Sequence, residues 1–199
     1  TVGADAVQKG KSMFAGKLGQ QVASASVSIQ DDPFHPEGIA SLPFDGEGVA
    51  SQSHYVIDKG FLKGYLYDSY TASRDGVSST GNGQRFSFRS LPTVAPSNMI
   101  LEAGEESREQ LMADIDRGLY ITDVMGMHTA NPISGDFSVG AAGLLIENGH
   151  LSRAVRGVTI AGNLIDLLHD IEAVGSDLRF MGSKAAPSIR LSALSISGD

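Results

Sequence analysis

The segment HTANPISGDFSVGAAGLLIENGH, residues 128–150, is the part of the chain richest in side chains that could do chemistry. It contains His128, Asp136 and Glu147, which are residue types that serve as general acids and bases. Asp136 lies between a glycine turn and an apolar strand, where capping backbone N–H groups is favoured over catalysis. Asp136 and Glu147 stand at opposite ends of one expected strand, so they cannot easily act as a pair. The segment is therefore better interpreted as a loop and hairpin than as an acid–base centre.

Metal binding is the second chemistry to consider. The five histidines are isolated from one another, no HExxH pattern occurs, and the chain has no cysteine. His169, Asp170 and Glu172 fall on an expected helix, but without a second histidine they indicate an exposed face. The carboxylate doublets at 31–32 and at 45 and 47 could hold a hard cation, although such doublets on loops are usually solvated. We predict no intrinsic metal site and no cofactor in this chain.

Nucleophilic catalysis has little support in the sequence. An N-terminal threonine can act as a nucleophile with its own amine as base, but the residues after Thr1 do not form an expected first strand. The chain lacks a G-x-S-x-G elbow, and neither of its glycine-rich turns continues into a phosphate-binding loop. The first thirty residues suggest a chain entered partway through a domain, with an N-terminal region absent.

The elements that would position these residues are mostly short strands. Alternating patterns predict strands over 22–29, 54–58, 61–68, 85–88, 98–104, 118–126, 136–147, 150–162, 176–181 and 188–197. Lys59-Gly60 and Asn148-Gly149 predict tight hairpins. Helices are expected over 8–18, 69–76, 107–118 and 163–175, and the proline- and glycine-rich stretch 31–48 is an expected long loop. This mixture predicts an α+β fold of mostly antiparallel sheet, barrel- or sandwich-like, with three or four short helices.

Composition limits the partners. The net charge is −8 and no cluster of lysine and arginine stands out along the sequence, which argues against nucleic acid. No apolar run is long enough to span a bilayer, and no export signal is present, so we expect no membrane contact. The absence of cysteine fits the reducing cytoplasm, which is the expected localisation.

Several motifs together resemble the TldD/PmbA family, also called modulators of DNA gyrase. They are SGDFSVGAAGLLIENGH with its flanks ITDVMGMHTANP and VRGVTIAGNLIDLLHDIEAVGSDLRF, together with DDP, PFDGEGV, LKGYLYDSYTASRDG, STGNGQR and PSIRLSALSISG. The resemblance extends from about residue 14 to residue 198. It implies that residues 1–199 are a single C-terminal domain from a cytoplasmic metallopeptidase system in which two related chains process or degrade peptides.

The resemblance also implies where the chain departs from the catalytic branch. That branch holds zinc with an HExxxH helix in the N-terminal region and a cysteine in the C-terminal region. This chain has neither, and MGSKAAPSIR, near the expected cysteine loop, contains no cysteine. The resemblance is therefore closer to the PmbA (TldE) branch, which implies a non-catalytic partner of a zinc peptidase. The chain would pair either with a TldD-like catalytic subunit or with a second copy of itself. Two alternatives stay open: a competent metallopeptidase whose motif lies in the missing region, with His128 as a further ligand, and an interaction module without proteolysis.

The part of the chain expected to face a peptide or a partner is the start of the opening segment. A peptide can add a strand to an exposed sheet edge, and a glycine-rich strand allows close backbone approach, although the same glycines could serve internal packing. The candidate peptide- or partner-facing residues are His128, Asn131, Ser134, Gly135, Asp136, Phe137 and Ser138.

Overall fold

Turns with left-handed backbone close the two hairpins that the sequence predicts. In the computed structural model, which describes residues 2–198, Asn148 and Gly149 have φ angles of 51° and 77°. They join β8 (Asp136–Glu147) to β9 (His150–Asn163). Lys59 and Gly60, with φ angles of 47° and 83°, join β2 (His54–Asp58) to β3 (Phe61–Leu62) in the same way. Positive φ at both central residues is typical of the type I′ turn, whose twist matches that of the strands.

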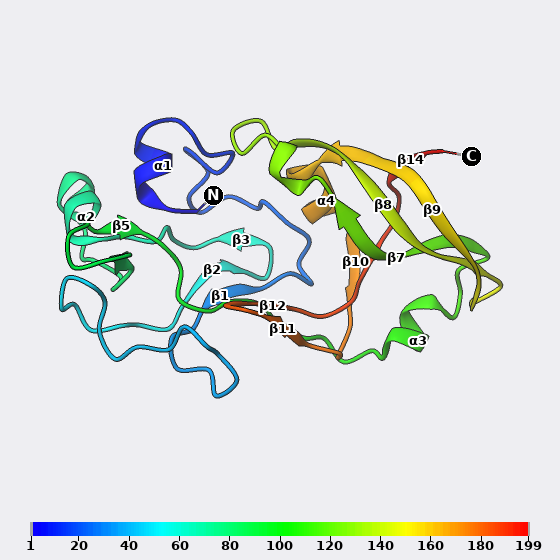
Figure 1. The fold of residues 1–199 in the computed structure, drawn as a ribbon, viewed down its shortest axis with the longest axis horizontal. Helices are drawn as coiled ribbons and strands as arrows, with labels where there is room; N and C mark the ends of the chain where they lie inside the picture. Colours follow the sequence, from blue (N-terminus) through cyan, green and yellow to red (C-terminus); the bar gives the residue numbers. More distant parts are fainter. Residues whose placement is uncertain (1, 199) are drawn as a thin grey trace.

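The β8–β9 hairpin is the centre of the longest sheet. Its strand order is β14-β9-β8-β7, with β7 (Arg117–Met125) and the short β14 (Ser195–Ser197) at the edges. β7, β8 and β9 are long and strongly twisted, and the whole sheet lies at one end of the molecule (Figure 1). Apolar side chains on one face form a small core. Its buried members are Val139, Ala141, Val158 and Ile160.

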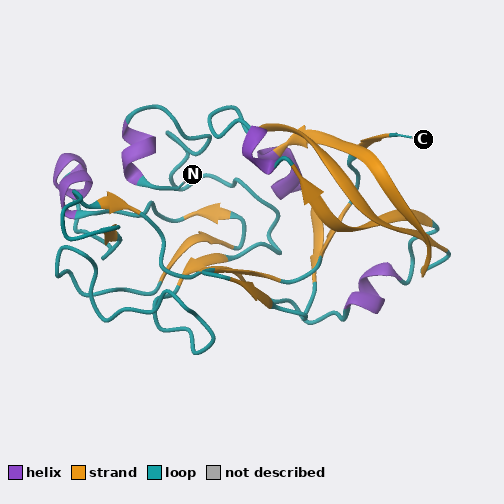
Figure 2. Ribbon diagram, viewed as in Figure 1, coloured by secondary structure: helices purple, strands orange, loops and turns teal. Residues whose placement is uncertain are grey.

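The other half of the molecule is built on a sheet of short strands in the order β11-β12-β6-β1-β2-β3. Its remaining strands are β1 (Ile29–Asp31), β6 (Met99–Leu101), β11 (Arg179–Met181) and β12 (Lys184–Ala186). All its pairs are antiparallel except β12 with β6. Two small sheets pair β4 (Gly83–Gln84) with β5 (Thr93–Val94), and β10 (Ile171–Val174) with β13 (Ile189–Leu191). Long loops connect these strands (Figure 2).

Residues 2–198 also contain four short α-helices and one 3-10 turn. They are α1 (Ala4–Gln8), α2 (Ser69–Asp75), α3 (Arg108–Met112), η1 (Met127–Thr129) and α4 (Leu164–His169). Asp68 and Ser107 each begin a helix with a complete capping box, and Gly76 ends α2 in the left-handed conformation. Among residues 2–198, no helix has the length and apolarity to cross a bilayer. The predicted α+β class with mostly antiparallel sheet is confirmed, and the open sheets are sandwich-like rather than a closed barrel.

Three predicted helices are wrong in extent. The helix expected over 8–18 is replaced by α1, which ends at Gln8, because Gly10 and Gly16 adopt positive φ and turn the chain. The helix expected over 163–175 begins as predicted, with the Asn163 side chain accepting the Ile165 N–H, but it ends at His169. The chain then enters β10, because the buried β-branched residues that follow pair with β13 instead of continuing the helix. The helix that follows Ser107 also ends before Gly118, which lies in β7.

Some predicted strands are also wrong. Residues 22–28 contribute buried apolar side chains but no strand, because Ser24 bonds the N–H and hydroxyl of Ser26 and makes a turn. Residues 85–88 form an exposed turn closed by hydrogen bonds between Ser87 and Ser90. The strand expected over 61–68 is limited to β3. In each place a local side-chain bond or a break in pairing overrides the alternating pattern.

Candidate functional site

The loop of residues 126–135, here called the site loop, connects β7 to β8 and is organised by Asn131. The Asn131 Oδ1 accepts the N–H groups of Ile133 and Ser134 at 2.9 and 3.2 Å. The Asn131 N–H donates to the Asp136 carbonyl at 2.9 Å, and the Gly135 N–H donates to the Asn131 carbonyl at 2.9 Å. An asparagine that satisfies two following N–H groups in this way fixes a tight turn. Sequence analysis selected Asn131 as a contact residue, and the structure shows it shaping the loop.

The Asp136 carboxylate is also part of this framework. It accepts a hydrogen bond of 2.9 Å from the Asn163 Nδ2, which donates as well to the Ser134 carbonyl at 2.8 Å. Hydrogen bonds from Ser134 and Asn163 hold the pKa of the Asp136 carboxyl below its usual range. A carboxylate kept ionised by its neighbours is a poor general acid. The geometry thus favours a structural role over a catalytic one, although the partners of the carboxylate are the Ser134 and Asn163 side chains and not the backbone N–H groups that the sequence suggested. Asn163 ties the site loop to the start of α4.

The remaining predicted residues are separated by their surroundings. His128 is exposed on η1, and Ser138 is exposed on β8 opposite Ala161. Phe137 is half-buried and packs with the small core of the long sheet. Asn131, Ser134, Gly135 and Asp136 therefore form one connected group, whereas Phe137 contributes to packing.

Exposed apolar side chains lie in the site loop and next to it, and the candidate residues chosen from the sequence do not include them. We call them the apolar strip: Val124 and Met125 at the end of β7, and Met127 and Ile133 in the loop. The sequence pattern of residues 118–126 predicts one hydrophobic face, made of Leu119, Ile121 and either Val124 or Met125. A bulge between Ile121 and Asp123 shifts the register, so Ile121 packs toward the core whereas Met125 is 51% exposed. Methionine side chains adapt to irregular partner surfaces, which makes the strip suited to contact.

The glycine-rich strand itself offers no free edge. β8 is hydrogen-bonded to β7 on one side and to β9 on the other. A Cβ built on Gly143 would stand 2.0 Å from the carbonyl oxygen of Tyr120 in β7. The structure therefore favours internal packing as the reason for this glycine, and the available edges belong to β7, to β14 and to the part of β9 that β14 does not cover.

The carboxylates at 31 and 45 are held inside the fold and are not solvated, contrary to the expectation for loop doublets. Asp31 accepts hydrogen bonds from the Asn82 Nδ2 at 2.6 Å and the Ser97 hydroxyl at 2.8 Å. Burial raises the pKa of the Asp31 carboxyl, against the effect of these bonds. Asp45 accepts the N–H groups of three residues, at 2.8–3.0 Å. Both carboxylates thus join loops that are distant in the sequence.

The described residues do not fit a zinc site. Zinc in proteins takes three or four ligands from histidine, cysteine and carboxylate side chains, at about 2.0–2.3 Å. Residues 2–198 bring no three such side chains together, and the chain contains no cysteine. The segment 181–190 forms the end of β11, a turn at 182–183, β12 and the start of β13. Between β12 and β13, the Ser188 N–H and hydroxyl donate to the Asp177 carboxylate. Thr1, the other candidate for chemistry, lies outside the described residues.

Comparison with known proteins confirms the resemblance. Residues 1–198 match the family described as the PmbA/TldA metallopeptidase C-terminal domain. The solved structure of a Thermotoga maritima protein, named as a candidate modulator of a DNA gyrase, is 43% identical with a TM-score of 0.92, over 98% of this chain and 45% of that one. TldE from Thermococcus kodakarensis is 32% identical with a TM-score of 0.91, over 99% of this chain and 45% of its own.

A curated relative extends the same result. Metalloprotease PmbA from Escherichia coli O157:H7 is 34% identical over 181 residues, which are 91% of this chain and 38% of that protein. The chain thus spans less than half the length of these three relatives. Both the family match and the identities hold over nearly the whole chain. The chain belongs to the PmbA/TldD metallopeptidase family, where it corresponds to the C-terminal domain.

Proposed function

We propose that this chain is the C-terminal domain of a PmbA/TldE-like subunit, the non-catalytic partner in a zinc metallopeptidase system that processes or degrades peptides. The observation that carries the proposal is which side chains segment 181–190 offers as metal ligands. The resemblance places a cysteine ligand of the catalytic branch in this region, whereas here the β11–β12 hairpin and its link to β13 carry no cysteine, histidine or carboxylate. The close structural match to TldE is consistent with the same branch.

The surface proposed to face the peptide or the catalytic partner combines the site loop, the apolar strip and the free edge of β7. The outer side of β7 has no neighbouring strand among the described residues, so its backbone groups can pair with an added strand. The hydrogen bonds of Asn131 and Asn163 hold the loop in place beside that edge. A rigid loop next to an open edge and exposed methionines gives a partner both backbone and side-chain contacts.

Metal analysis tests the catalytic assignment. The protein in its natural length is purified alone and together with a TldD-like chain, and zinc and peptide hydrolysis are measured for each. We expect zinc and hydrolysis only when the TldD-like chain is present. Stoichiometric zinc in the isolated protein would instead support a competent peptidase, and recovery of gyrase without a TldD-like chain in a pull-down would support an interaction module.

Surface variants test the proposed contact. Met127→Glu and Ile133→Glu place a charge in the apolar strip and are expected to weaken binding of the TldD-like chain at least about tenfold by calorimetry. Val77→Glu is the matched control, because Val77 is similarly exposed and follows α2, which lies at the left end of the molecule, away from the β7–β8 loop (Figure 1). Equal affinity of all three variants would remove this surface from the interface.

A further inference from the structure

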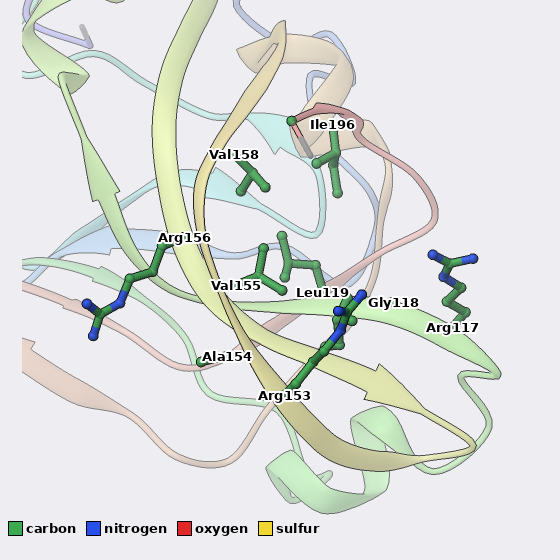
Figure 3. Close-up of a pocket in the computed structure, with 11 residues that line it drawn as sticks. Arg117, Gly118, Leu119, Arg153, Ala154, Val155, Arg156, Val158 and Ile196 are labelled. Carbon is green, nitrogen blue, oxygen red and sulfur yellow. The ribbon is translucent and has the colours of Figure 1, made fainter.

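The long sheet carries an open groove that no residue of the site loop lines (Figure 3). It has a volume of about 680 Å³, which is within the range of binding sites. Its floor is made by apolar side chains of β7, β8, β9 and β14: Leu119, Leu145, Val155, Val158 and Ile196. Three arginines, Arg117, Arg153 and Arg156, also line it, and the apolar side chains lie between Arg156 on one side and Arg117 on the other.

These arginines are notable in a protein of net charge −8. None of the three forms an ion pair with a described residue, whereas Arg190 binds Asp114 and Glu172. Arg153 and Arg156 are both exposed. Guanidinium groups beside an apolar floor can bind carboxylates while the rest of a ligand packs below them. The groove is therefore complementary to a ligand that combines negative charge with apolar side chains.

The groove also borders a free strand edge. β14 pairs with β9 only over Thr159–Ala161, and Gly198 lies against Val158. From His150 to Gly157, β9 has β8 on one side and no described strand on the other. Arg153 and Arg156 belong to this unpaired stretch. Exposed edges pair readily with added strands, and charged residues on an edge limit which strands can pair.

We propose that residues 150–157 of β9 bind an extended acidic polypeptide segment. The segment pairs with β9 as an added strand, on the same side of β9 as β14 and in line with it. Its backbone pairs with the free edge, its apolar side chains rest on Leu119, Val155 and their neighbours, and its carboxylates meet Arg153 and Arg156. The arginines repel basic segments, and a neutral segment offers no carboxylate to pair with the arginines. This site is separate from the site loop and does not depend on the assignment of the catalytic or non-catalytic branch.

Fluorescence anisotropy with the purified protein tests the proposal. The probe is a labelled heptapeptide of alternating glutamate and valine, compared with versions in which glutamine or lysine replaces glutamate. We expect saturable binding of the glutamate peptide that weakens with added salt, and at least about tenfold weaker binding of the other two. N-methylation of the backbone amides that would face β9 should abolish binding, because it removes the donors needed for strand pairing.

The variant Arg153→Gln/Arg156→Gln should lose about tenfold or more in affinity for the glutamate peptide. The matched control is Arg74→Gln/Arg89→Gln, which removes two exposed arginines from α2 and the loop after β4 and should change affinity less than about twofold. Circular dichroism verifies that both variants fold. The proposal is overturned if the glutamate peptide does not bind, if the glutamine peptide binds equally, or if the groove variant keeps its affinity. Unchanged binding of the N-methylated peptide would overturn strand addition.

Discussion

Gly143→Ala tests whether the glycines of β8 serve internal packing. The Cβ that alanine adds would stand 2.0 Å from the Tyr120 carbonyl oxygen and 3.0 Å from the Ile121 Cα, both backbone atoms of β7. A backbone cannot rotate away as a side chain can, so β7 and β8 must move apart beside the bulge that follows Ile121. Overpacking that forces backbone shifts costs about 1–3 kcal/mol and occasionally more, while replacing glycine in a strand returns about 0.5–1 kcal/mol. A clash with backbone atoms falls at the upper end, about 3–3.5 kcal/mol, so we expect a net loss of about 2–3 kcal/mol.

Gly140→Ala is the matched control in the same strand. Its Cβ would have its nearest contact at 3.5 Å, with the Met125 methyl group, so nothing has to move. Only the gain in strand propensity remains, and the variant should be stabilised by up to about 1 kcal/mol. Urea unfolding measures both free energies, and Gly143→Ala should also lower Tm by about 4–12 °C. The packing explanation fails if Gly143→Ala unfolds at the wild-type midpoint, or if Gly140→Ala loses as much stability.

Three further predictions concern the hydrogen-bonded carboxylates. Asp31→Ala leaves the Asn82 amide and the Ser97 hydroxyl without their buried acceptor and should cost about 2–4 kcal/mol in urea unfolding, with a smaller loss for Asp31→Asn, which keeps one acceptor oxygen. Because burial raises the pKa of the Asp31 carboxyl, the folded state binds the carboxyl proton more tightly than the unfolded chain does. The free energy of unfolding of the wild type, relative to that of Asp31→Asn, should therefore rise as the pH falls from neutral toward about 4. A difference between the two proteins that does not change with pH would contradict this prediction. Asn163→Ala removes the α4 cap and a bond to Asp136; it should cost about 1–2 kcal/mol and raise the Asp136 pKa in an NMR titration, and an unchanged pKa would exclude the bond.

Local signals were sufficient for the features that the sequence predicted well. The Asn148-Gly149 turn and the start of a helix at Ser107 depend on residues within a few positions of one another, and both are present. The Gly76 stop of α2 is of the same kind. Such features are determined by backbone preferences and short-range hydrogen bonds, which do not need the rest of the fold.

Features that depend on distant partners could not be found in this way. Nothing near Asp31 in the sequence indicates that it pairs with Asn82, 51 residues away, or with Ser97, 66 residues away. The bulge after Ile121 is equally hidden, because an alternating pattern assumes unbroken register. The arginine groove combines residues of β7 and β9 that are neighbours only after the strands pair.

The hydrogen bonds separate two classes of family motif. DDP, PFDGEG and STGNGQ meet in the first half of the molecule, where Asp31 and Asp45 bind the loop that contains Asn82 and Gly83. Their polar groups are used within the fold, so a partner would have to break those bonds to use them. The apolar strip and the arginines of the groove are different, because exposed side chains there have no such role in the described structure. Contacts with peptides or partners are therefore expected at the edges of the long sheet, where binding costs the fold least.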